Sequence, residues 1–142
     1  MQSIHRKTAL PEQQKEIATM DVFTAAKAGD LAAIKRHIRE GGSFNSRNRT
    51  GATPLMFAVE CAQPTVVKLL LDEGANINAQ DRLGQTALMI AAARDDTDSG
   101  KLLLQHRANL NTTAANGLTA LGYATSKSAA AMKKLLVAAG AR

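Results

Sequence analysis

The stretch TPLMFAVE at residues 53–60 decides the fold, because it recurs twice at a constant interval. TALMIAAA occupies residues 86–93 and TALGYATS occupies residues 119–126, so each copy begins 33 residues after the previous one. Self-similarity at a fixed period of this size is the sequence signature of a repeat protein. The chain of 142 residues is therefore expected to consist of copies of one small unit.

The period extends beyond these stretches to the whole unit. Each copy shares an initial glycine and a later apolar triplet, at Gly51, Gly84 and Gly117 and at residues 69–71, 102–104 and 135–137. A fainter copy precedes them, in which Ile34 and Gly41 stand 33 residues before Val67 and Gly74. We infer four units from these matching columns.

The second unit, GATPLMFAVECAQPTVVKLLLDEGANINAQDRL at residues 51–83, resembles an ankyrin repeat. The TPL motif, the GAN motif and the apolar triplet carry the resemblance in combination, over about residues 20–142. It implies an all-α fold, an ankyrin-repeat solenoid of stacked helix-turn-helix units joined by short β-hairpin-like turns. The implied boundaries are a partly helical N-terminal extension at residues 1–19, a first repeat that caps the stack at 20–49, repeats at 50–82 and 83–115, and a closing repeat at 116–142.

The physical chemistry of the second unit explains its residue types. The hydroxyl of Thr53 can cap a helix, and the proline after it suits the first helical turn, where no backbone donor is needed. A turn around Ala62 and Gln63 should lead into a second helix that starts at Pro64. Gly74 should end that helix in the left-handed conformation, which other residues adopt only at a cost.

One column departs from the family pattern. Ankyrin repeats usually carry histidine after TPL, where it ties the turn to a neighbouring loop, whereas this chain has Met56, Met89 and Gly122 there. We interpret the two methionines as core residues that replace the polar tie by packing, because methionine fills irregular apolar gaps.

The third unit departs furthest from the others. Ser99 and Gly100 stand in the columns of two valines of the second unit, and Arg107 stands where the second and fourth units have glycine. A glycine inside a helix costs about 1 kcal/mol, and a left-handed arginine adds a comparable penalty. We therefore expect the third unit to be the least stable of the four.

Composition restricts the class of protein. A hydrophobic fraction of 45% and a charged fraction of 21% are typical of a globular chain, and the scarcity of aromatic residues leaves a core of Ala, Leu, Ile, Val and Met. No apolar run approaches the roughly 20 residues of a membrane-spanning helix. Cys61 has no second cysteine to pair with, so we expect it to be a small buried hydrophobe in a reducing, cytoplasmic setting. A periplasmic or secreted location stays open if a leader peptide was removed.

The chain carries no recognisable catalytic or cofactor motif. Its three histidines are scattered, and its glycines punctuate turns without forming a phosphate-binding loop. The acidic stretch DDTDSG at residues 95–100 lacks the spacing of a calcium loop, and we interpret its carboxylates as caps of a helix. We predict no catalytic residue, no metal site, no cofactor and no small-molecule substrate, and hence no enzyme.

The ankyrin resemblance implies binding at the turn tips and at the ends of the first helices, along one concave face. Carried over by matched position, the predicted partner-binding residues are Lys27, Arg47, Arg49, Thr50, Glu60, Gln80, Arg82, Leu83, Gln85, Arg94, Thr113, Asn116 and Lys127. The basic members of this set are predicted to align as a stripe, with Glu60 as its one acidic residue. The net charge of +6 favours an acidic partner.

Two functions are compatible with these observations. The leading hypothesis is a noncatalytic, monomeric module that binds one protein partner with an acidic patch, as an inhibitor, immunity factor or adaptor in a bacterium. The alternative is a binder of anionic surfaces, either nucleic acid or membrane, through the basic stripe. The near absence of aromatic residues for base stacking disfavours nucleic acid.

Overall fold

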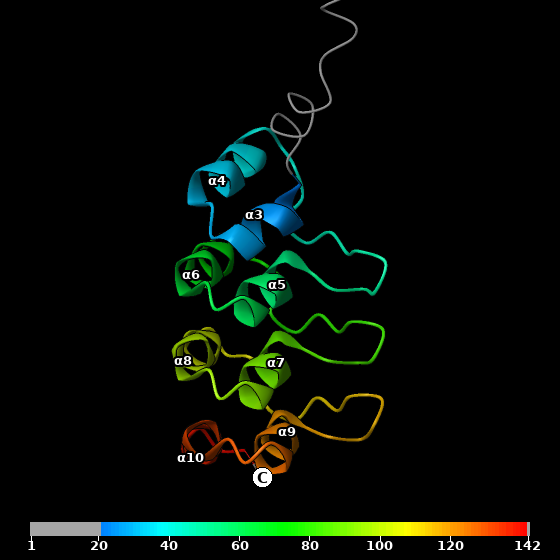
Figure 1. Ribbon diagram of the computed structural model, residues 1–142, viewed down its shortest axis with the longest axis vertical. Coiled ribbons are helices and arrows are strands. Elements are labelled where there is room, and N and C mark those ends of the chain that lie inside the picture. Colours follow the sequence, from blue (N-terminus) through cyan, green and yellow to red (C-terminus); the bar gives the residue numbers. More distant parts are fainter. Residues whose placement is uncertain (1–20, 142) are drawn as a thin grey trace, which may run out of the picture.

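The computed structural model describes residues 21–141, and this part of the chain forms eight α-helices and no strand. The helices are α3 (Val22–Ala28), α4 (Leu31–Arg39), α5 (Pro54–Glu60), α6 (Pro64–Asp72), α7 (Ala87–Ala93), α8 (Thr97–Gln105), α9 (Ala120–Ser126) and α10 (Ala130–Ala138). They stack as two columns that lie side by side (Figure 1). The loops between units project from the column of α3, α5, α7 and α9, which we call the inner column, and the outer column consists of α4, α6, α8 and α10. The predicted all-α solenoid is confirmed, whereas the predicted extension at residues 1–19 lies outside the described residues.

A threonine starts the inner helix of each of the last three units. Thr53, Thr86 and Thr119 all have extended backbones, and their hydroxyls accept hydrogen bonds from the backbone N–H groups three residues later at 3.3, 3.3 and 3.2 Å. These bonds satisfy a donor that the first helical turn would otherwise leave free. The cap predicted for Thr53 is confirmed, and Asp21 takes the same role for α3.

Each unit turns sharply between its two helices at one left-handed residue. The positions form a column of Gly29, Ala62, Asp95 and Ser128, with φ between 54° and 73°. The turn predicted around Ala62 is confirmed. Asp95 also links two units, because its Oδ1 accepts a hydrogen bond from Met132 N at 2.8 Å, in the first turn of α10. Since Ala129 offers α10 no side-chain cap of its own, Asp95 supplies one from the preceding unit.

The core runs through the stack as columns of equivalent residues. The inner helices contribute an alanine column of Ala25, Ala58, Ala91 and Ala124, and the outer helices contribute a leucine column of Leu70, Leu103 and Leu136, all at most 1% exposed. Alanine permits close approach of neighbouring helices, while leucine supplies most of the apolar area removed from water. The apolar faces of each unit are therefore buried against its neighbours.

The fourth unit has exposed polar residues in columns that are buried in other units. Thr125 is exposed in the column of buried Val59 and Ala92, and Lys133 is exposed in the column of buried Val67. Polar outer faces on terminal repeats keep a solenoid soluble. The polar residues at these positions are those expected of a closing repeat.

The third unit contains the irregularities that the sequence predicts. Ser99 is fully buried, and its Oγ has no hydrogen-bond partner within residues 21–141. Arg107 has a left-handed backbone with φ of 64°. Gly100, however, has a packing role: a Cβ at this position would lie 2.6 Å from the sulfur of Met132 in the fourth unit. The missing side chain of Gly100 makes room for a larger one in the adjacent helix.

We predict that the backbone amides of α8 exchange with deuterium faster than those of α6. Both helices belong to the outer column and have a neighbouring unit on each side. However, α8 has Ser99 and Gly100 where α6 buries Val66 and Val67, and Arg107 adds left-handed strain at its end. Hydrogen exchange read out by mass spectrometry measures the difference. Equal protection of the two helices would contradict the expectation.

We predict that Ser99→Ala stabilises the protein by about 1–2 kcal/mol, because it removes a buried unpaired hydroxyl and improves helix propensity. Gly100→Ala should not stabilise it, because the new Cβ would overlap Met132. Urea unfolding of the two variants measures both changes. A gain from Gly100→Ala equal to that from Ser99→Ala would show that propensity alone limits this unit.

Candidate functional site

The loops between units fold back on themselves as hairpin-like turns. Each loop is closed by an equivalent backbone hydrogen bond. The three bonds run from Asn48 N to Ala52 O at 3.0 Å, from Asp81 N to Gln85 O at 3.0 Å and from Ala114 N to Leu118 O at 2.9 Å. In the first two loops a side chain reinforces the turn: Oδ1 of Asn48 accepts from the N–H groups of Thr50 and Ala52, and Oδ1 of Asp81 accepts from those of Leu83 and Gln85. These bonds fix the loop shape without regular strands.

The three hairpins are also bonded to one another. Arg82 N donates to Thr50 O, and Ala115 N donates to Leu83 O, each at 2.9 Å. They consequently project side by side from the inner helices as a row (Figure 1). A row tied in this way presents a preformed surface, so binding to it needs little ordering of the backbone.

A relay of asparagines joins the bases of the hairpins. Asn45 Oδ1 accepts from Asn76 N at 2.7 Å, and one period later Asn78 Oδ1 accepts from Asn109 N at 2.8 Å. Each bond crosses from one unit to the next. Met56 and Met89, which stand where ankyrin repeats usually carry histidine, are 1% exposed and pack in the core as predicted.

A groove of about 480 Å³ lies between the hairpins and the inner helices of the second and third units. Its floor comprises Met56, Phe57, Met89, Ile90 and Ala93. Its hairpin wall comprises Asn48, Thr50, Ala52, Asp81 and Gln85, and its helix wall comprises Glu60 and Arg94. The groove therefore combines an apolar floor with polar walls, the usual composition of a binding surface.

The size of one residue in a repeated column explains why this groove is open. Ile90 occupies the column of Phe57 and Tyr123. Tyr123 extends from the fourth unit, and its hydroxyl accepts hydrogen bonds from Gln85 Nε2 at 3.2 Å and Asn116 Nδ2 at 3.1 Å. Phe57 packs edge-on against Phe23 of the first unit, with ring centroids 5.7 Å apart. Larger side chains thus occupy this column in the second and fourth units, and Phe57 is itself part of the groove floor.

Comparison with known proteins agrees with this geometry. A family model described as ankyrin repeats (three copies) matches residues 21–81 and 63–142. The chain belongs to the ankyrin repeat family. It is also similar to the ankyrin repeat domain-containing protein oryK of Aspergillus oryzae, with 39% identity over 51 residues, which are 36% of this chain and 8% of that relative. Ankyrin repeats are generally protein–protein interaction modules and are typically noncatalytic.

The groove between the second and third ankyrin units, which we call the hairpin groove, brings together four of the predicted site residues. They are Thr50, Glu60, Gln85 and Arg94. The prediction did not include Asn48 and Asp81, although they share one column and lie at the start of each hairpin. The prediction also omitted the apolar floor of the groove, because the sequence alone suggests that apolar residues such as Ile90 are buried in the core. The variation of that column from Phe to Ile to Tyr was the available signal.

Several other predicted residues hold the ankyrin hairpins together. Arg47 Nη1 donates to Gln80 O at 2.7 Å, Gln80 Nε2 donates to Thr113 O at 3.1 Å, and Asn116 donates to the Tyr123 hydroxyl. These side chains shape the surface through contacts within the protein. Leu83, by contrast, is 63% exposed at the tip of the second hairpin.

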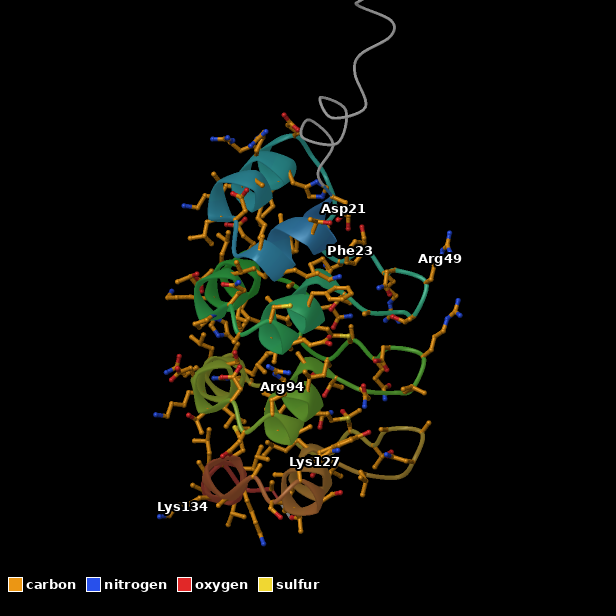
Figure 2. All side chains as sticks on the ribbon, viewed as in Figure 1. Asp21, Phe23, Arg49, Arg94, Lys127 and Lys134 are labelled. Carbon is orange, nitrogen blue, oxygen red and sulfur yellow. The ribbon has the colours of Figure 1, made fainter. Side chains whose placement is uncertain are left out.

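The predicted basic stripe is divided into two rows. Arg49 and Arg82 are at the hairpin tips, and Arg49 points away from the stack, whereas Arg94 and Lys127 lie at the ends of the inner helices (Figure 2). Lys27 joins the second row, with its ammonium 4.6 Å from the centroid of the Phe57 ring. The tip row and the helix-end row lie on opposite sides of the hairpin groove, because the tip residues and the helix-end residues belong to different parts of the unit.

Cys61 was predicted to be buried, and this prediction is wrong. Its side chain is exposed at the end of α5, one residue beyond the last helical position. The same column holds Arg94 and Lys127, so it faces solvent in each of the last three units. In the described range 21–141, no group of three or more His, Cys, Asp or Glu side chains could hold a metal ion, and no helix there is long and apolar enough to cross a membrane.

We predict that Asn78→Ala lowers the free energy of unfolding by about 1 kcal/mol, because it removes the acceptor of the Asn109 N–H. Asn45→Ala removes the equivalent acceptor one unit earlier, where Asn45 Oδ1 accepts from Asn76 N at 2.7 Å, and should cause a similar loss. Chemical denaturation measures both variants. An unchanged free energy of unfolding in both variants would show that the inter-unit bonds do not contribute to stability.

Proposed function

We propose that this chain is a noncatalytic module that binds one protein partner in the groove between the second and third units. One observation carries the proposal: an apolar floor that includes Phe57 and Ile90 lies open between the hairpins and the helices, whereas Tyr123 fills the equivalent place in the fourth unit. An apolar side chain of the partner would cover Phe57 and Ile90. Burial of such an anchor in a preformed pocket is the typical source of affinity in protein interfaces.

The charges around the groove support a partner with an acidic patch. Arg49, Arg82 and Arg94 are exposed on its two sides, and arginine is enriched at interface hot spots. Complementary charge at the rim raises the association rate and selects among partners more than it raises affinity. A monomeric chain of this kind would act as an inhibitor, immunity factor or adaptor, because covering a partner's surface requires no chemistry.

A general preference for phosphate or lipid headgroups is less well supported. Glu60 and Asp81 line the groove beside the apolar floor. Their carboxylates would repel a phosphate backbone at the place where the surface is most hollowed. The partner we propose therefore places its acidic residues at the tips and an apolar residue at the centre.

Charge reversal at the hairpin tips tests this proposal. The full chain and an Arg49→Glu/Arg82→Glu variant are used as baits in native lysate, and the captured protein is then purified and titrated. We expect the double variant to lose affinity at least about tenfold, since two rim charges become repulsive. Lys35→Glu is the control, because Lys35 is an exposed lysine on the outer helix α4 and lines neither the groove nor any hairpin.

Equal loss from the tip variant and the Lys35→Glu control would remove the groove from the proposal. Capture of nucleic acid or lipid in place of protein, with an affinity that falls by decades on modest addition of salt, would favour the anion-binding alternative. Ala93→Trp supplies a second check, because it fills the groove without changing charge. It should abolish binding while the thermal unfolding transition stays in place.

A further inference from the structure

A lysine recurs at one position of all four outer helices, on the side of the stack away from the groove described above. Lys35, Lys68, Lys101 and Lys134 are separated by one period each, and all four are exposed. They lie on α4, α6, α8 and α10, which form the outer column in Figure 1. This column is shared by every unit, so differences among the units lie in what surrounds each lysine.

Only the second unit neutralises its lysine within its own helix. Lys68 Nζ is 2.9 Å from Asp72 Oδ2, and His106 Nε2 of the third unit is 3.3 Å from Asp72 Oδ1. The hydrogen bond from Lys68, assisted by His106, lowers the pKa of Asp72. In the third and fourth units the position of Asp72 is taken by Gln105 and Ala138. No ion pair involves Lys101 or Lys134 in the part of the chain that the structure describes.

The positive charge of the whole chain is concentrated at this end. Residues 99–142 contain six basic residues and no Asp or Glu, so they account for the entire net charge of +6. The acidic side chains nearest in sequence are Asp95, Asp96 and Asp98, at the start of α8. Their distribution leaves the rest of α8 and all of α10 without an acidic residue.

A second groove, of about 360 Å³, runs between α8 and α10 at this charged end. We call it the α8–α10 groove, and it is lined by Lys101, Leu104, Gln105, Leu135, Ala138 and Ala139. Val137, which is 53% exposed, belongs to the same helix. The groove thus has an apolar floor and a lysine at its edge, while Lys134 precedes Ala138 by one helical turn on the same face.

The groove is open because alanine replaces a histidine that occupies the equivalent place one unit earlier. Between α6 and α8, His106 Nδ1 lies 3.0 Å from Leu102 O and His106 Nε2 lies 3.3 Å from Asp72 Oδ1, and a ring N–H donates to either oxygen. Ala139 holds this column in the fourth unit. Between α8 and α10 the ring is replaced by Ala139 and its acidic partner by Gln105. Leu104 and Leu135 are left partly buried beside two lysines that form no ion pair in the described residues.

We propose that the α8–α10 groove docks an acidic segment of a protein, with one large apolar side chain in the groove and carboxylates on Lys101 and Lys134. Packed helices lie about 8–10 Å apart, so the two carboxylates should be separated by roughly that distance. Charge complementarity selects the segment, and burial of the apolar side chain against Leu104 and Leu135 holds it. This site shares no lining residue with the groove between the second and third units.

The surface fits a protein segment better than lipid or nucleic acid. Interfacial lipid binding uses a broad apolar helix face, whereas α10 offers one exposed valine beside a hollow. Single-stranded nucleic acid is held by exposed aromatic rings, and neither α8 nor α10 contains an aromatic residue. A hollow with apolar walls suits a single inserted side chain.

Selection from a library of random dodecapeptides displayed on phage tests the proposal. The library is panned on the full chain with soluble Lys101→Glu/Lys134→Glu variant as competitor, and the enriched peptides are synthesised with a fluorescent label. We expect acidic residues on both sides of a Leu, Ile, Met or Phe. The Lys101→Glu/Lys134→Glu variant should bind them at least about tenfold more weakly, and the hairpin variant Arg49→Glu/Arg82→Glu should bind them normally.

Ala138→Trp separates docking from simple charge attraction, because it fills the α8–α10 groove and keeps both lysines. It should also weaken the labelled peptide at least about tenfold, with unchanged circular dichroism and melting temperature. Enriched peptides without acidic residues, or peptides that bind Ala138→Trp as tightly as the parent chain, would overturn the proposal. So would tighter, lysine-dependent binding to vesicles of about 30% phosphatidylserine or to a single-stranded oligonucleotide.

Discussion

Burial of each unit against its neighbours is the constraint on which the rest of the molecule depends. A unit consists of helices of only seven and nine residues, and isolated helices shorter than about 12–15 residues are marginal in water. The alanine and leucine columns remove these helices from water only when another unit lies alongside. The free energy of folding is therefore approximately a sum of terms for the units and for the interfaces between them. An unfavourable residue changes the term of its own unit and of the interfaces that this unit forms.

Because the scaffold repeats every column, the functional surfaces arise where a column changes. The hairpin groove is open because isoleucine stands between phenylalanine and tyrosine at one position of the inner helices. The α8–α10 groove is open because alanine follows histidine at one position of the outer helices. In both places the neighbouring unit shows what the full-sized side chain does: Tyr123 bridges to Gln85, and His106 bridges to Asp72. A smaller side chain would leave a cavity if its column lay in the core. On the surface of the stack, the same change leaves an open groove.

The fold could be predicted from the sequence because its determinants are local and repeated. The threonine caps, the turn at Ala62 and the left-handed Arg107 each depend on residues within one unit, and the period identifies them several times over. Cys61 shows where this reasoning failed, since apolar character alone suggested burial although its column contains Arg94 and Lys127. The single basic stripe failed for a related reason: the tip residues and the helix-end residues recur at the same period but occupy different parts of the unit.

The grooves themselves could not be predicted, because they depend on how far a side chain reaches from another unit. The sequence places Tyr123 in the column of Ile90, but only the three-dimensional arrangement shows its hydroxyl meeting Gln85 and Asn116. Gly100 is a similar case: glycine in a helix reads as a loss of stability, whereas the structure shows Met132 occupying the space it leaves.

The third unit contributes to both grooves, through α7 to one and through α8 to the other, and it is also the unit with a buried unpaired hydroxyl and a left-handed arginine. Any ligand that binds only the folded form of this unit stabilises it by mass action. If opening of the unit removes both surfaces at once, thermodynamic linkage requires that occupancy of one groove strengthen binding at the other by the same factor in each direction. The least regular unit of the stack is thus the one whose order both ligands would share.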